Sequence, residues 1–196
     1  LLALAAECAW IFTISGSCGA GIGPKINPTF LFLGIALIEE YVKYLPVKYL
    51  VLRRCQTHQV CNLDEPVDAM IYMMTAALGF AALENVLFQI PIFESGLAPS
   101  IEVAANRFLG ANLLHALSSG IVGFFLARAW FHPKRHHFIA LGVLIAAALH
   151  ALFNYFILIR EAIPQGTFYL IMLLSTMAVM VFVDFERLKR SKTSNQ

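Results

Sequence analysis

Two adjacent glutamates and a lysine stand in the middle of a long apolar segment. Glu39 and Glu40 precede Lys43 by four and three residues, so on a helix the ammonium group can reach a carboxylate and neutralise one negative charge. One lysine cannot neutralise two carboxylates, and the second is left without a counter-charge. Such a carboxylate can take a proton from water, which makes Glu39 and Glu40 candidate general bases with Lys43 in a supporting role.

Three further apolar segments carry polar groups of a similar kind. Glu84 is followed by Asn85, whose amide can donate two hydrogen bonds, and His115 stands in the next segment. His150 and Asn154 are four residues apart, so on a helix they share a face and can act on one bound atom. Charged and polar groups are costly inside a bilayer and usually have a functional reason. All five residues are therefore candidate site residues, Asn85 in a supporting role.

The segments that carry these groups are long enough to cross a membrane. Of 196 residues, 59% are apolar and 13% are charged, whereas a soluble domain has about a quarter charged residues. A membrane-spanning helix needs roughly 20 mostly apolar residues. The sequence therefore predicts an all-α, polytopic membrane bundle that forms a single domain over residues 1–196. Its six spanning segments are approximately residues 1–15, 29–52, 68–93, 102–130, 138–159 and 167–185.

The polar groups lie at similar depths in this predicted bundle. Counted from the outer ends of their helices they are about 9 to 13 residues in, or about 13 to 20 Å at 1.5 Å per residue. The groups compared are Glu39, Glu84, His115 and His150. A single His or Asn in a bundle is usually an interhelical hydrogen-bond partner. Four helices that place polar groups in one layer instead predict one buried polar site.

The positive charges predict the orientation of the chain. Of the Lys and Arg residues between the predicted spans, only Lys25 and Arg160 lie on the predicted outer side of the membrane. Under the positive-inside rule we expect the chain start and the polar, frayed tail 186–196 in the cytoplasm. The chain begins without Met inside an apolar run, which we interpret as a truncated first helix. Nine of the 14 Lys and Arg residues lie on the predicted cytoplasmic side, within 53–54, 128–135 and 187–192.

Four short motifs resemble those of one known family. Residues 39–43 (EEYVK) are similar to the EExxK motif of the PrsW-type intramembrane proteases, and residues 79–85 (GFAALEN) to their GFAxxEN motif. Residues 115–120 and 150–154 resemble two later motifs that contain histidine. All four occur in family order, over roughly residues 30–160. The family belongs to the superfamily of CAAX-prenyl and bacteriocin-processing peptidases, so the resemblance implies peptide-bond hydrolysis in or near the membrane.

The resemblance also implies a partner and a location. The substrate would be a membrane-anchored protein or peptide, in bacterial members typically a single-pass regulator such as an anti-sigma factor. The location would be a bacterial or archaeal cell membrane. The chain has 14 basic and 12 acidic residues, which excludes the strongly basic surface of a nucleic-acid-binding protein. The expected partners are thus the substrate and the lipid bilayer, with no nucleic acid.

Hydrolysis of an amide needs an activated water, a donor to the oxyanion and a proton for the leaving amine. Glu39 or Glu40 can activate the water. His150 and Asn154 can donate to the oxyanion. His115 can hold the water or relay its proton, and the mechanism then needs no cofactor.

A second version of the mechanism uses one Zn²⁺. Two histidines and one glutamate form the ligand set of a class of catalytic zinc sites, with a further glutamate as the base. His115, His150 and Glu84 could be the ligands and Glu39 the base. Glu84 could otherwise hold the water in the version without metal. The ligands do not have the HExxH spacing, so the sequence favours the version without metal and keeps the zinc version as the alternative.

The same buried groups could instead form the proton relay of a transporter or channel. Transporters are often built from repeated halves with interrupted helices, and this sequence has no internal repeat. The sequence therefore favours an intramembrane protease, with a proton-coupled transporter or channel as the alternative.

Overall fold

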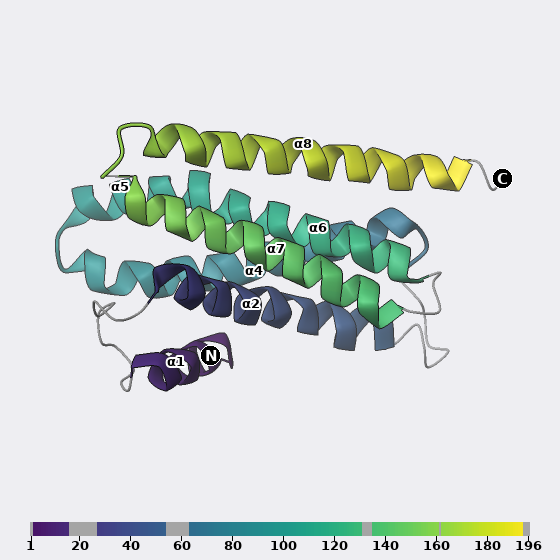
Figure 1. Ribbon diagram of the computed structural model, residues 1–196, viewed down its shortest axis with the longest axis horizontal. Helices are drawn as coiled ribbons and strands as arrows, with labels where there is room; N and C mark the ends of the chain where they lie inside the picture. Colours follow the sequence, from purple (N-terminus) through teal and green to yellow (C-terminus); the bar gives the residue numbers. More distant parts are fainter. Residues whose placement is uncertain (1, 16–26, 54–62, 131–134, 161, 194–196) are drawn as a thin grey trace.

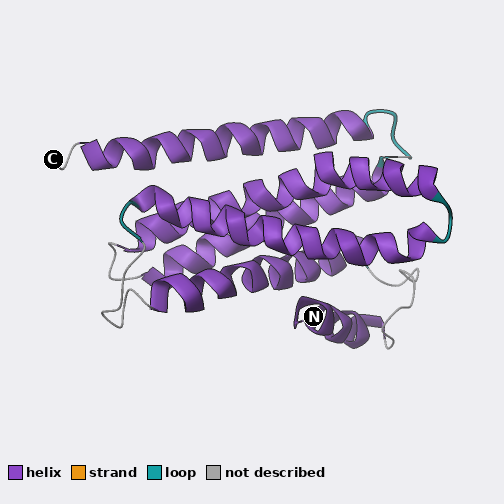
Figure 2. Ribbon diagram, turned by 180° about the vertical axis from the view of Figure 1, so that it is seen from behind, coloured by secondary structure: helices purple, strands orange, loops and turns teal. Residues whose placement is uncertain are grey.

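The computed structural model describes residues 2–15, 27–53, 63–130, 135–160 and 162–193, which form an elongated bundle of helices (Figure 1). Among these residues there is no strand (Figure 2). The elements are α1 (Leu2–Ser15), α2 (Pro28–Pro46), η1 (Val47–Leu52), α4 (Pro66–Phe93), α5 (Leu97–Arg107), η2 (Phe108–Asn112), α6 (Leu113–Trp130), α7 (Arg135–Ile159) and α8 (Gly166–Thr193).

The nine elements form six helical rods, which confirms the predicted all-α fold over the described residues. The π-helical segment η1 continues α2 from Pro46, the point at which proline removes a backbone donor from the α-helical pattern. In the same way α5, η2 and α6 form one helical run. The helix α4 begins at Pro66, two residues before the predicted start, because Asp68 accepts hydrogen bonds from the backbone N–H groups of Asp64 and Glu65 (3.0 and 2.8 Å).

The expectation of a frayed tail from residue 186 is wrong for residues 186–193, which continue α8. Leu188 is buried against the bundle, and Arg187 lies 3.6 Å from Asp184 on the same helix. These contacts hold the polar end of α8 in helical form. Three of the basic residues on which the predicted orientation depends lie outside the described residues, namely Lys25, Arg54 and Lys134.

Four described helical runs are long and apolar enough to cross a membrane, namely Pro66–Phe93, Leu97–Ala129, His136–Ile159 and Gly166–Arg190. The outward faces of α4 and α8 carry large exposed apolar side chains such as Leu78 and Phe182. A water-facing bundle would cover these faces with polar groups. The helix α2 is less apolar because it carries Glu39, Glu40 and Lys43, but all three side chains are buried in the bundle.

The helix α6 is the centre of the bundle and packs against α4, α7 and α8. Nearly all of its residues are buried, as expected of a helix that is apolar on every face. At Gly123 a Cβ atom would lie only 2.5 Å from the Cα atom of Met70. Glycine at this position therefore lets α4 and α6 approach closely, and this brings Glu84 on α4 near the polar residues of α6.

The short helix α1 lies at the edge of the bundle, beside α2 (Figure 1). The indole N–H of Trp10 donates to the carbonyl of Leu31 at 3.3 Å, and the Trp10 ring lies 5.2 Å from that of Phe30. The same ring fills the space above Gly34, where a Cβ atom would lie 2.1 Å from it. Trp10 thus fixes α1 on the outer face of α2.

Candidate functional site

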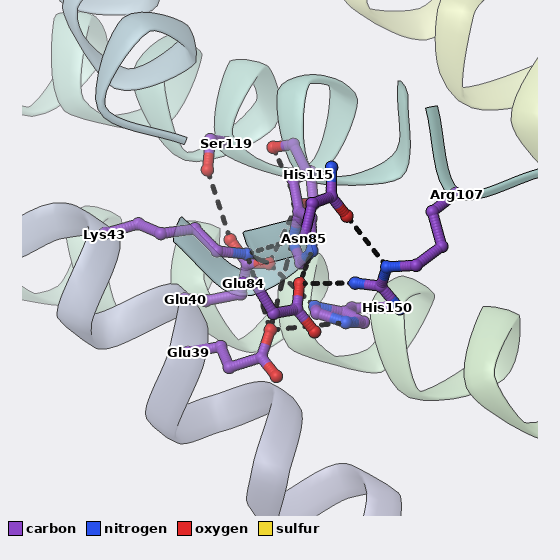
Figure 3. A network of polar contacts seen from close by, with 10 residues as sticks. Glu39, Glu40, Lys43, Glu84, Asn85, Arg107, His115, Ser119 and His150 are labelled. Atoms are coloured by element: carbon purple, nitrogen blue, oxygen red, sulfur yellow. Dashed lines mark hydrogen bonds and ion pairs between the residues drawn. The ribbon is translucent and has the colours of Figure 1, made fainter. Parts of the chain in front are cut away.

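Polar side chains from four helices meet in the interior of the bundle (Figure 3). Their exposed fractions are between 0 and 6% for Glu39, Glu40, Lys43, His115 and His150. The first three come from α2, whereas His115 lies on α6 and His150 on α7. Glu84 reaches the same cluster from α4. The prediction of one buried polar site built from four helices is therefore confirmed.

Glu40 is the carboxylate with the most partners. Its Oε1 atom accepts hydrogen bonds from Lys43 Nζ at 2.7 Å and from Ser118 Oγ at 2.8 Å, and lies 3.0 Å from His150 Nδ1. Its Oε2 atom accepts from Ser119 Oγ at 3.4 Å. Both oxygens are occupied, so Glu40 joins α2, α6 and α7 at this level. Ser118 and Ser119 were not among the candidate site residues predicted from the sequence.

Glu39 is in the opposite situation. Its Oε2 atom is buried and has no hydrogen-bond partner among the described residues. Three nitrogen atoms lie just beyond hydrogen-bond distance, namely His150 Nε2 at 3.6 Å, Lys43 Nζ at 3.9 Å and His115 Nδ1 at 4.0 Å. A buried charged oxygen without a partner is costly. The position is therefore suited to a water molecule or a cation between Glu39 and the two imidazoles.

Each histidine is held by a carboxylate on the ring nitrogen that points away from Glu39. Nε2 of His115 lies 2.8 Å from Glu84 Oε2, and Nδ1 of His150 lies 3.0 Å from Glu40 Oε1. An ionised carboxylate can only accept a hydrogen bond, so in a neutral imidazole these nitrogens carry the proton. The other nitrogen of each ring then presents a lone pair toward Glu39.

This arrangement fits a metal ion. One ligand atom each from Glu39, His115 and His150 lie within 4.8 Å of one another, and three protein ligands are typical of catalytic zinc sites. A carboxylate on the second nitrogen of a ligating histidine is also typical of such sites. Nδ1 of His115 accepts a hydrogen bond from Lys43 Nζ at 2.8 Å, and a metal ion on this nitrogen would replace that bond.

The three converging residues differ from the predicted metal set in one member. The sequence suggested Glu84 as the third ligand, but Glu84 contacts Nε2 of His115, whereas Nδ1 is the nitrogen of that ring that lies near Glu39. Glu39 takes the position next to both imidazoles. Spacing along the chain could not distinguish the two glutamates, because both lie at the same predicted depth.

A second layer of contacts surrounds Glu84. Arg107 Nη2 lies 3.1 Å from Glu84 Oε2, and Arg107 Nε donates to Asn85 Oδ1 at 2.8 Å (Figure 3). Asn85 in turn donates to Asn112 Oδ1 at 2.7 Å. Asn85 therefore supports the site through Arg107. Sequence reasoning did not include Arg107 in the site, although an arginine inside a predicted membrane segment was the signal that could have identified it.

Asn154 is not brought into the cluster. It lies half-buried on α7, and no hydrogen bond joins it to another described residue. Its role as an oxyanion donor stays a prediction.

A cavity of about 270 Å³ opens onto the cluster beside Glu39 and Glu84. One wall comes from α1 and includes Leu4 and Glu7, and the facing wall comes from α4. The α4 wall is apolar, with Phe80, Leu83, Leu87 and Phe88. Glu7 is a further carboxylate that the sequence analysis left out, although it also stands inside an apolar segment. A small apolar group can therefore be accommodated next to Glu39.

Comparison with known proteins agrees with this geometry. Residues 3–183 match the profile described as "PrsW family intramembrane metalloprotease". A protein named "Protease PrsW" from Geobacillus kaustophilus is 34% identical over 131 residues, which are 66% of this chain and 52% of that protein. Proteins of the same name from Oceanobacillus iheyensis and Bacillus subtilis are each 27% identical and match 82% of this chain. A search of solved structures found no match.

The chain spans between 52 and 66% of the length of these three relatives. The profile match, however, covers most of the described residues and contains all four helices of the buried site. This chain belongs to the PrsW family of intramembrane metalloproteases.

Proposed function

We propose that the buried cluster is the active site of a protease that hydrolyses a peptide bond of a membrane-anchored protein. The observation that carries the proposal is the buried Oε2 atom of Glu39, which has no hydrogen-bond partner among the described residues and lies beside Nδ1 of His115 and Nε2 of His150. The relatives named Protease PrsW support the same reaction class. By the resemblance of its motifs, the substrate is an anti-sigma factor or a similar regulator.

The charges of the cluster support a bound cation. Three carboxylates, those of Glu39, Glu40 and Glu84, face two cationic side chains, Lys43 and Arg107. Net negative charge in a low-dielectric interior is unfavourable unless a proton or a cation compensates it. Glu39, His115 and His150 would hold the ion, while Glu84 and Glu40 orient the two imidazoles.

A Zn²⁺ ion bound there would supply a Lewis acid and an activated water. Glu39 is required with or without the ion, either as a ligand or as the base that takes the proton of the attacking water. Glu40 cannot act as this base while both of its oxygens are hydrogen-bonded. Its contribution is to hold His150 in the tautomer that turns a lone pair toward Glu39. Lys43 and the two serines fix Glu40 in turn.

Metal content tests this assignment. The purified chain is expected to retain about one Zn²⁺, and the double variant His115→Ala/His150→Ala to retain almost none and to cleave no reporter. Glu84→Gln is expected to weaken Zn²⁺ affinity by about 10- to 100-fold, because the orientation of His115 is lost. Elemental analysis gives the zinc content, and competition with a chelator gives the Zn²⁺ affinity.

The exposed His137 provides the control, since His137→Ala removes an imidazole from the same helix α7 without touching the cluster. Full cleavage by protein stripped of zinc would contradict the metal site. Glu39 would then act as the general base in a reaction without metal.

We place the substrate chain along the cavity between α1 and α4. A peptide whose scissile bond lies at Glu39 could insert an apolar side chain between Leu83, Leu87 and Phe88. The variant Leu87→Trp fills this space and is expected to lower kcat/KM by about tenfold or more. Leu78→Trp is the matched control, because Leu78 lies on the lipid-facing side of α4 and does not line the cavity.

Cleavage kinetics of a membrane-anchored reporter give the comparison, and the Zn²⁺ content of both tryptophan variants should equal that of the wild type. Equal kcat/KM for Leu87→Trp and the wild type would place the substrate elsewhere.

The compact form of the cluster supports a protease over a transporter or channel. A proton relay needs polar groups that follow one another across the membrane, whereas the cluster residues on α2, α4, α6 and α7 converge at one level. We further propose a bacterial cell membrane as the location, since the named relatives are bacterial. The C-terminal end of α8 would face the cytoplasm, together with Arg53 and Arg128.

A further inference from the structure

A second and larger cavity, of about 650 Å³, lies away from the buried cluster, between the end of α2, η1 and the first half of α7. It is a groove with apolar walls, to which Leu52, Leu126, Ile139, Val143 and Leu144 contribute. Nothing in the proposed reaction uses it. Its lining residues include the end of η1 and the start of α7, two segments that lie at the same end of the bundle (Figure 1).

The polar residues of the groove are basic or phenolic. Lys48, Arg53 and His136 line it together with Tyr41, Tyr44 and Tyr49, and no acidic residue is among the described lining residues. Lys48 has no acidic partner in the described part of the chain, and its Nζ atom lies 5.5 Å from the centre of the Tyr49 ring. The groove therefore combines an apolar floor with a positively charged rim that can pair with an anion.

The apolar part and the basic end of the groove are spaced like the acyl chain and the headgroup of a lipid. Tyr41 and Arg53 are twelve residues apart along α2 and η1, which is about 18 Å at 1.5 Å per residue. One leaflet of the hydrocarbon core is about 15 Å thick. An acyl chain can thus lie along Val143 and Leu144 while its headgroup stays at the basic end.

We propose that this groove binds one anionic phospholipid, such as phosphatidylglycerol. The phosphate pairs with Lys48 and Arg53, next to His136, and the acyl chain fills the apolar part between η1 and α7. Basic pockets between membrane helices on the cytoplasmic side are suited to anionic headgroups. Because Glu39 and Glu40 lie on the same helix as Tyr41, the lipid would also brace α2 from the side opposite the substrate cavity.

Native mass spectrometry tests the proposal. The purified chain is placed in a mild detergent with equimolar phosphatidylglycerol and phosphatidylcholine that have identical acyl chains. The wild type is expected to retain one phosphatidylglycerol in preference to phosphatidylcholine. Each basic residue near an anionic lipid contributes about fivefold in affinity, so Lys48→Gln/Arg53→Gln should lower retention at least about tenfold, and Lys48→Gln alone about fivefold.

The control is Lys189→Gln, an exposed lysine on α8 that does not line the groove; it should retain as much phosphatidylglycerol as the wild type. Leu144→Trp narrows the apolar part and should lower retention of the lipid although every basic residue is kept. Equal retention of both lipids by the wild type would overturn the proposal. So would phosphatidylglycerol binding that inorganic phosphate displaces and that Leu144→Trp leaves unchanged, because that site would bind the anion alone.

Discussion

Replacing Glu39 with glutamine is expected to reduce cleavage of a membrane-anchored substrate by about a thousandfold or more while the protein still folds. The amide is nearly isosteric with the carboxylate, so packing on α2 is preserved. It can neither take a proton from water nor provide an anionic ligand, and general base catalysis alone is worth about 10²- to 10⁴-fold. Because Oε2 of Glu39 has no hydrogen-bond partner in the described residues, the substitution breaks no hydrogen bond of that atom.

Co-expression with a tagged single-pass substrate, followed by detection of the shortened product, measures this effect. Glu102→Gln is the matched control, because Glu102 is an exposed carboxylate on α5 outside the cluster. It should cleave as well as the wild type. If folded Glu39→Gln retained more than about a tenth of wild-type cleavage, Glu39 would be neither the base nor a required ligand, and the proposed active site would have to be abandoned.

Much of the site could be predicted from the sequence because hydrocarbon penalises polar groups. Glu39, Glu84, His115 and His150 could be recognised as unusual in their segments, and equal depth on four helices was enough to predict that they meet. The helical spacing of Lys43 also predicted its ion pair with a carboxylate. These arguments need only the rise per residue and the thickness of the bilayer.

The partners within the cluster could not be predicted in the same way. Lys43 can reach residues three or four positions earlier on its helix, so its choice of Glu40 at 2.7 Å over Glu39 at 3.9 Å depends on Ser118, Ser119 and His150, which also bind Glu40. The tautomers of the histidines depend on the same three-dimensional contacts. Periodicity places a side chain on a face but does not determine which of two neighbouring carboxylates is left free.

The cavity between α1 and α4 was also beyond the reach of sequence patterns. It depends on α1, which is only 14 residues long and is attached to α2 by Trp10 and Gly34. Neither the length nor the composition of α1 indicates that its Leu4 and Glu7 would cover the entrance beside Glu39. Long-range packing of this kind requires the positions of all the helices at once.

Removing the charge of Lys43 is expected to produce the largest loss of stability. Lys43 as a whole is 1% exposed, and its ammonium group contacts Glu40 at 2.7 Å and His115 at 2.8 Å. Lys43→Met keeps the length of the side chain but leaves two buried carboxylates on α2 without this cation. Breaking a buried ion pair from one side costs about 3–5 kcal/mol. Equilibrium unfolding in mixed detergent micelles with increasing sodium dodecyl sulfate measures the change, with the exposed Lys189→Met as the control.

The double variant Lys43→Met/Glu40→Gln separates the ion pair from packing. It removes both charges of the Lys43–Glu40 ion pair, so it should recover more than half of the stability that Lys43→Met loses, whereas activity should stay low because His150 loses its carboxylate partner. A double variant as unstable as Lys43→Met would mean that the other contacts of the lysine, such as that of its Nζ atom 5.1 Å from the centre of the Phe80 ring, matter more than its ion pair with Glu40. The recovery is expected because the cost of Lys43→Met comes from an uncompensated charge, and Glu40→Gln removes that charge without changing the shape of the site.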